Sequence, residues 1–196
     1  MLQNSPRLST VLPPTYALLF AVVVIAQGCQ SDPSLPSGGE QLSVPDHELR
    51  LDLDADGIPD FLFSYQGTQK ADIPPSAVSW ILNVDGFDDH QVQYNNDIGT
   101  IPMLDGATIS DASGWSVFDT PLATRAWERG IGWSRAWVGV WIGVGPRSLG
   151  LRLKKSDGWH YGWVKLAVDA RTGNLSILDS AWQRQPDRPI RAGLHG

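Results

Sequence analysis

Residues 51–63 read LDLDADGIPDFLF, with four aspartates close together and apolar residues on both sides of them. The apolar flanks predict two strands, and Gly57 allows the sharp turn of a short loop between them. Oxygen-bearing side chains at alternate positions of such a loop suit calcium, which binds about six to eight oxygen atoms. We therefore predict that this loop holds a calcium ion and pins two strands of a sheet together.

The predicted calcium ligands are four carboxylates and one main-chain carbonyl, namely Asp52, Asp54, Asp56, the carbonyl of Ile58, and Asp60. The alternative is a solvated acidic turn without an ion. Neighbouring carboxylates repel one another unless a cation neutralises them, which favours the bound ion. Phe63 stands where an EF-hand has its bidentate glutamate. We therefore expect a different type of loop, with a modest affinity and a structural role.

The composition of the 196-residue chain is that of a globular protein, with 42% hydrophobic and 18% charged residues. Its 20 glycines, 14 prolines and 9 tryptophans indicate many turns and a β-rich, aromatic core. The formal net charge of -6 opposes binding to phosphate backbones, so nucleic acid is not expected as a partner. A single cysteine excludes disulfides within the chain, so extra stability must come from packing or from a bound ion.

The amino-terminal segment has the pattern of an export signal. The apolar run at residues 16–26 follows a basic residue, Arg7, and is shorter than a membrane-spanning helix. The sequence AQGC at residues 26–29 resembles the lipobox of bacterial lipoproteins, in which the cysteine becomes the lipidated first residue. This resemblance implies a membrane anchor on Cys29. An ordinary cleaved signal and an uncleaved anchor helix are the alternatives, and each of them also places the folded domain outside the cytoplasm.

These observations divide the chain into three parts. Residues 1–28 form a lipoprotein-type signal peptide, residues 29–45 a Ser/Pro/Gly-rich tether, and residues 46–193 the folded domain. The expected location is the cell envelope, on the periplasmic or the outer surface. The protein is secreted instead if Cys29 carries no lipid.

Short strands between turn signals fill the folded domain, which predicts an all-β fold, a single antiparallel β-sandwich of jelly-roll type. Residues 122–128 have the composition of a helical turn, and residues 133–144 that of one bent strand and a loop. The leucines at residues 149–153 alternate with polar residues and glycine, as in a strand with one buried face. The expected strands are residues 47–52, 60–65, 78–84, 90–94, 108–110, 149–153, 160–168 and 175–182, with the last two as a hairpin.

The end of the chain carries a recurring pattern. It reads HYGWVKL at residues 160–166, ILDSAW at residues 177–182 and PIRAG at residues 189–193. With the acidic stretch DLDADGIPDF, this ending resembles secreted, largely uncharacterised bacterial proteins that share the patterns DxDxDGxxDF and HYGW[IV]xL…DxA[YW]…PIxAG. The resemblance covers about residues 45 to 193. It implies an extracytoplasmic, β-rich domain without an established activity.

Three tryptophans, Trp133, Trp137 and Trp141, recur at every fourth position. Exposed, they would form a platform for stacking on sugar rings. Burial in the core is the favoured interpretation, because a domain with so many tryptophans needs most of them inside. His160 beside Asp157, as a catalytic base, and His90 beside its neighbouring aspartates, as a transition-metal ligand, lack the spacing of known sites. A structural role is favoured for both histidines.

The chain shows no motif for nucleophilic catalysis and no informative pair of glutamates. We therefore expect a non-enzymatic, calcium-stabilised lipoprotein with a role in envelope structure or adhesion. The alternative is a carbohydrate-binding module, or a sandwich-type glycoside hydrolase or lyase that acts on polysaccharide.

Overall fold

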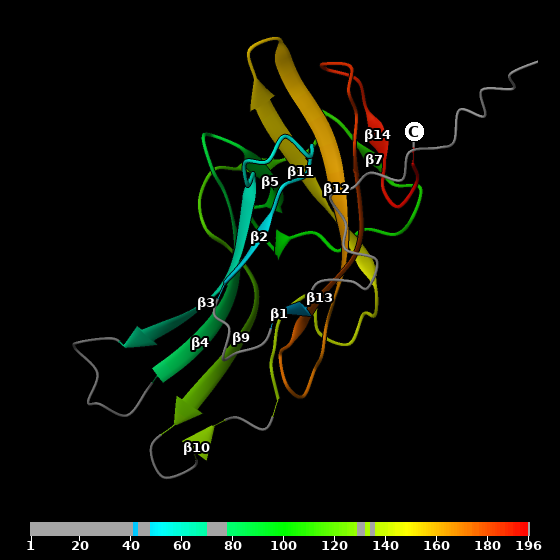
Figure 1. Cartoon of the computed structure of the whole chain (residues 1–196). Coiled ribbons are helices and arrows are strands. Elements are labelled where there is room, and N and C mark those ends of the chain that lie inside the picture. Colours follow the sequence, from blue (N-terminus) through cyan, green and yellow to red (C-terminus); the bar gives the residue numbers. More distant parts are fainter. Residues whose placement is uncertain (1–40, 43–47, 70–77, 129–131, 134–135, 196) are drawn as a thin grey trace, which may run out of the picture. The chain divides into compact units, whose positions relative to one another are not determined.

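A computed structural model describes residues 41–42, 48–69, 78–128, 132–133 and 136–195 (Figure 1). All of these residues belong to one compact unit, Asp32–Gly196. The described part of the chain consists of strands and turns without any helix, and its two larger antiparallel sheets pack against each other. The predicted all-β sandwich is therefore confirmed.

The first sheet has seven strands in the order β1-β13-β12-β11-β5-β6, and β8 also pairs with β5. Two antiparallel hairpins form its centre, β11 with β12 and β12 with β13. The second hairpin is the predicted one, and its turn contains Gly173 at a φ of 77°, which a side chain would strain. The strands are β1 (Gln41–Leu42), β5 (Gln91–Asn95), β6 (Gly99–Thr100), β8 (Trp115–Ser116), β11 (Arg147–Lys155), β12 (Gly158–Val168) and β13 (Leu175–Trp182).

The second sheet has five strands in the order β10-β9-β4-β3-β2. The helical turn expected at residues 122–128 is wrong, because this segment lies within strand β9 and pairs with β4 over most of its length. Pairing with a neighbouring strand overrides the local preference for helix. The strands are β2 (Glu48–Leu51), β3 (Phe61–Gln69), β4 (Val78–Gly86), β9 (Thr120–Glu128) and β10 (Gly132–Trp133).

The main core lies between the inner faces of the two sheets. Alternate residues of the longer strands point into it, apart from an irregularity where β4 pairs with β9, and this explains the alternating apolar pattern of the sequence. The five-stranded sheet contributes Leu49, Leu51, Phe61, Phe63, Tyr65, Leu82, Val84, Leu122 and Ala123, and the seven-stranded sheet contributes Val92, Leu149, Leu151, Leu153, Val164, Leu166, Val168, Leu175 and Ile177.

A second, smaller core covers the outer face of the seven-stranded sheet. Strand β14 (Ile190–Arg191) pairs with β7 (Thr108–Ile109), and this short ribbon packs over β12. Ile190 and Ala192 of the closing PIRAG segment lie in one cluster with Tyr161 and Trp163 of the HYGW segment. Both faces of the sheet are thus covered here. The expectation that β11 buries only one face is wrong, since Gly150 on its other face is also buried.

The segment expected to form one bent strand at residues 133–144 is mostly irregular. The two-residue strand β10 ends at Trp133, and residues 136–142 follow the edge of the sandwich with isolated bridges to two strands. Val138 bridges to Thr124 of β9, and Ile142 bridges to Val168 of β12. The segment is therefore fastened to both sheets, although it forms a regular strand with neither.

Candidate metal centre

The acidic loop, residues 52–60, joins the antiparallel strands β2 and β3. Leu51 of β2 pairs with Phe61 of β3, and the backbone N–H of Asp60 donates to the carbonyl of Leu51 at 2.8 Å. Both flanking residues are buried in the main core, as is Leu53 inside the loop. The core thus fixes the base of the loop, and the predicted loop between two strands is confirmed.

Carboxylates of the loop accept hydrogen bonds from its own backbone. Asp52 accepts from the N–H groups of Asp56 at 3.2 Å and Gly57 at 2.8 Å. Asp54 accepts from the N–H of Asp56 at 3.1 Å. Gly57 has a φ of 90°, in the left-handed region that favours glycine. The backbone is therefore wrapped around the first two acids of the loop.

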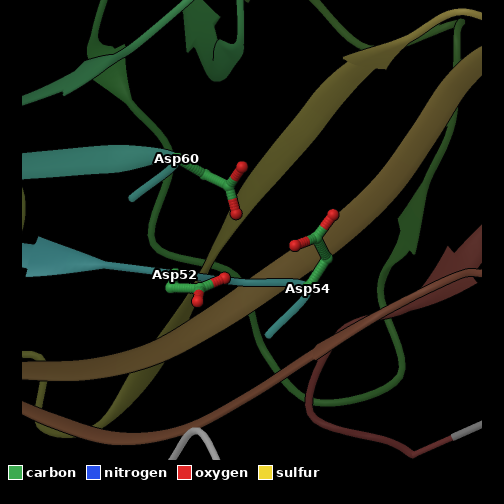
Figure 2. A group of neighbouring side chains, drawn as sticks. All are labelled: Asp52, Asp54 and Asp60. Carbon is green, nitrogen blue, oxygen red and sulfur yellow. The ribbon is translucent and has the colours of Figure 1, made fainter. Parts of the chain in front are cut away.

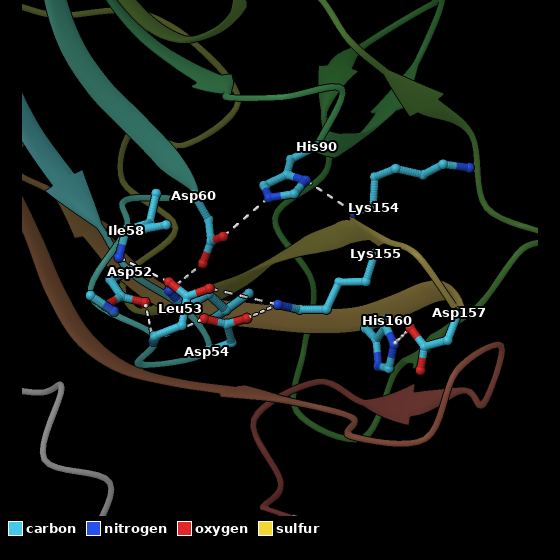
Figure 3. Close-up of polar contacts among 12 residues, drawn as sticks. Asp52, Leu53, Asp54, Ile58, Asp60, His90, Lys154, Lys155, Asp157 and His160 are labelled. Carbon is cyan, nitrogen blue, oxygen red and sulfur yellow. Dashed lines mark hydrogen bonds and ion pairs between the residues drawn. The ribbon is translucent and has the colours of Figure 1, made fainter.

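Asp60 is buried, with only 4% of its surface exposed, and it connects the two sheets. One carboxylate oxygen accepts from the backbone N–H of Leu53 at 2.7 Å, and the other lies 3.1 Å from Nε2 of His90. The backbone N–H of Lys154 donates to Nδ1 of the same imidazole at 3.0 Å (Figure 3). Because Nδ1 accepts a hydrogen bond, Nε2 carries the proton and donates it to Asp60. The imidazole thus orients this carboxylate.

Three carboxylates of the loop converge. Asp52, Asp54 and Asp60 each offer one oxygen, and these oxygens lie within 4.8 Å of one another. Figure 2 shows the three groups facing a common space. Oxygen ligands at such separations could hold a metal ion, which is the arrangement predicted for these three residues.

Asp56 lies outside this convergent group. It is exposed, and its carboxylate accepts from the backbone N–H of Ile58 at 2.9 Å. The Ile58 side chain is 62% exposed, and ligation by its carbonyl stays a prediction. The structure thus brings together three of the four predicted carboxylates.

A lysine supplies positive charge to the loop. Lys155, the last residue of β11, extends its ammonium group to a close ion pair with Asp54, and its Nζ lies 3.9 Å from a carboxylate oxygen of Asp56 (Figure 3). The hydrogen bond to Asp54 raises the pKa of Lys155, so the side chain stays positively charged. Three convergent carboxylates and one ammonium leave a net negative charge, which attracts a cation.

The sequence pattern does not link His90 or Lys155 to the acidic loop. The sequence places His90 beside neighbouring aspartates, whereas the structure holds it between Asp60 and the backbone of Lys154. Both residues reach the loop from the seven-stranded sheet, so only the packing of the two sheets brings them there. Spacing along the chain carries no signal for such contacts.

Three tryptophans are expected either to stack on sugars or to fill the core, and the structure describes the side chains of two of them. Trp137 and Trp141 are only 2% and 1% exposed, so the stacking platform is wrong for these two residues and their core interpretation is confirmed. The indole N–H of Trp141 donates to Oγ1 of Thr100 at 2.8 Å. The side chain of Trp133 lies outside the described side chains, as Cys29 lies outside the described residues.

His160 and Asp157 are in contact, as their proximity in the sequence suggested. Nε2 of His160 lies 3.0 Å from the carboxylate of Asp157, and Nδ1 lies 2.9 Å from the carbonyl of Gln183. Both ring nitrogens face acceptor oxygens, and the ring is 2% exposed. This contact lowers the pKa of Asp157. A buried ring held at both nitrogens ties the β11–β12 turn to the chain after β13, which is a structural role.

An open apolar hollow of about 290 Å³ lies elsewhere on the surface. Its described lining contains no carboxylate, amine or imidazole. It is formed by Tyr94, Ile98, Gly99, Pro121, Leu122, Ala123, Thr124, Val138, Gly139 and Val140.

Comparison with known proteins finds no matching family model, no similar curated protein and no similar solved structure. Within the described residues, no helix has the length and apolar character needed to cross a bilayer. The candidate metal centre is therefore interpreted from its own residues.

Proposed function

We propose that this protein is a non-enzymatic β-sandwich stabilised by calcium and displayed outside the cytoplasm, with a structural or adhesive role at the cell envelope. The observation that carries the proposal is the convergence of Asp52, Asp54 and Asp60 beside the junction of two sheets. An ion bound there stabilises the folded chain only, since the unfolded chain does not hold these oxygens together.

Calcium fits this site better than a transition metal does. The convergent ligands are carboxylate oxygens, and both nitrogens of the nearby imidazole of His90 already take part in hydrogen bonds. Calcium accepts irregular oxygen sets at distances of about 2.3–2.6 Å, whereas magnesium demands a near-ideal octahedron. With external calcium at about 1 mM and a Kd of about 0.1 mM, the stabilisation is about 1.4 kcal/mol.

Thermal melting with calcium and with a chelator tests the calcium site. A gain of about 1.4 kcal/mol corresponds to a rise in Tm of about 3–5 °C for a domain of this size. The substitution Asp52→Asn should abolish the calcium-dependent rise. The matched control is Asp97→Asn, which removes the same charge from an exposed position between β5 and β6. Equal Tm values in calcium and chelator would contradict the proposal.

The location is tested separately, because it depends on the amino-terminal sequence. The lipobox-like sequence at residues 26–29 supports attachment through a lipid on Cys29. Cells that express the full chain should incorporate labelled palmitate into it, and the Cys29→Ala variant should lose this label. Label that persists in the variant would rule out Cys29 as the anchor.

A further inference from the structure

Lys155 reaches the acidic loop from the opposite sheet. It is the last residue of β11, in the seven-stranded sheet, whereas Asp54 lies in the loop between two strands of the five-stranded sheet. The side chain of Asp54 is only 3% exposed and that of Lys155 is 30% exposed. The ion pair therefore connects the sheets at a place where water screens the carboxylate poorly.

A carboxylate as buried as Asp54 needs a positive partner. Removing an ionised group from water costs several kcal/mol unless an opposite charge or hydrogen bonds compensate for it. The backbone N–H of Asp56 supplies one hydrogen bond to Asp54, and Lys155 supplies the opposite charge. This combination allows the loop to close without a metal ion.

The same ammonium contacts a carboxylate that a metal ion at this site would use. Lys155 contacts Asp54, which is one of the three convergent carboxylates, and it is attracted by Asp56 and Asp60 as well. A divalent cation at the centre would repel the ammonium at short range. The side chain is partly exposed and flexible, so it is able to swing toward solvent.

We propose that Lys155 is a built-in counter-ion of the acidic loop, which holds the loop closed in the metal-free protein and must leave Asp54 when a divalent cation binds. The competition with the cation rests on the proposed calcium site, whereas the role in the metal-free protein does not. Competition of this kind keeps the calcium affinity modest.

The neighbouring residue Lys154 offers a matched control. Both lysines lie at the end of β11, but the side chain of Lys154 points away from the loop and lies over the ring of Trp159, with Nζ 4.6 Å from the ring centre (Figure 3). The substitutions Lys155→Met and Lys154→Met remove the same charge and keep a long apolar side chain. Only the first of them removes an ammonium from Asp54.

Calorimetric titration with calcium tests the competition. We expect Lys155→Met to bind calcium about tenfold more tightly than the wild type, because calcium no longer has to displace an ammonium group from Asp54. The Lys154→Met variant should bind like the wild type. If the wild type and Lys155→Met bind calcium with the same affinity, the competition is overturned and the calcium site stands. Binding to Lys155→Met alone would support the competition and contradict a calcium role in the wild type. Absence of binding to both proteins would overturn both ideas.

Melting in chelator tests the role in the metal-free protein. Lys155→Met should melt below Lys154→Met, because Asp54 loses its charge partner, and Lys155→Arg should melt like the wild type. Equal Tm values for the two methionine variants would overturn this role. If Lys155→Met is unfolded in chelator while Lys155→Arg is folded, refolding of Lys155→Met by calcium would support the competition, and failure to refold would overturn it.

Discussion

The two sheets are joined by charged groups at one end of β12 and by aromatic groups at the other. Near the start of β12, Asp60 contacts His90, and Lys155 contacts Asp54. Beyond the end of β12, the hydroxyl of Tyr65 in the five-stranded sheet donates to the carbonyl of Gly173 at 2.5 Å. The first junction is built from charged and polar groups beside the candidate metal centre, and the second depends on close packing.

The aromatic junction also uses the irregular segment at residues 136–142. Trp137 packs beside Tyr65, with ring centres 5.7 Å apart, and its backbone N–H donates to the carbonyl of Ala170 at 3.2 Å. A Cβ on Gly173 would lie 2.1 Å from the Trp137 ring, so the ring fills the space left by this glycine. The comparison teaches that one sandwich joins its two sheets in two ways, with charged side chains beside the candidate metal centre and with packed aromatic rings away from it.

The largest effect is expected from Trp137→Ala, which empties the centre of the aromatic junction. Loss of a buried tryptophan side chain should lower the free energy of unfolding by about 3–5 kcal/mol. Urea denaturation in calcium and in chelator measures the loss. The loss should be the same in both conditions, because the ring does not touch the acidic loop. A loss confined to one condition would break the distinction between the two junctions.

An intermediate effect is expected from Asp60→Asn at the charged junction. The amide has one acceptor oxygen where the carboxylate has two, so either the N–H of Leu53 or that of His90 loses its acceptor. The free energy of unfolding should fall by about 2 kcal/mol. The calcium-dependent rise in Tm should disappear as well, in contrast to Trp137→Ala. Retention of that rise would show that the ion does not use Asp60.

The smallest effect is expected from Tyr65→Phe, and it should change with pH. At neutral pH the variant loses the hydrogen bond to Gly173, which contributes about 1 kcal/mol. Burial raises the pKa of Tyr65 from 10.0 to about 12. The unfolded chain therefore ionises first, and the wild type loses stability as the pH rises between these two values.

The phenylalanine variant has no such ionisation at this position. Its disadvantage at neutral pH should shrink above about pH 10 and reverse near pH 11, since the wild type loses about 1.4 kcal/mol for each pH unit between the two pKa values. Urea denaturation of both proteins across this range measures the difference. A difference that stays constant with pH would show that Tyr65 ionises as easily in the folded protein as in the unfolded one.

The parts of the fold that depend on neighbouring residues could be predicted from the sequence. The alternating leucines of β11 and the turn at Gly173 identify their strands, because side-chain alternation and turn residues act locally. The spacing of Asp52, Asp54 and Asp60 likewise predicts their convergence, since all three belong to one short loop.

The parts that depend on pairing across the fold could not be predicted. Residues 122–128 have a helical composition, and only their pairing with β4 makes them a strand. Gly150 is buried because the side chain of Gln93, on the distant strand β5, lies against it, and a Cβ there would lie 2.1 Å from the Gln93 amide oxygen. His90 and Lys155 reach the acidic loop only after the two sheets have packed together.

The position of β12 along the chain has a consequence for folding. This strand lies in the interior of its sheet, between β11 and β13, and is covered on both faces, yet it begins only at Gly158. Residues of β12 pack against strands that lie as far away in the sequence as β2 and β3. Contacts between such distant parts of a chain slow folding. A deletion that removes β12 would therefore take away the centre of the seven-stranded sheet rather than its edge.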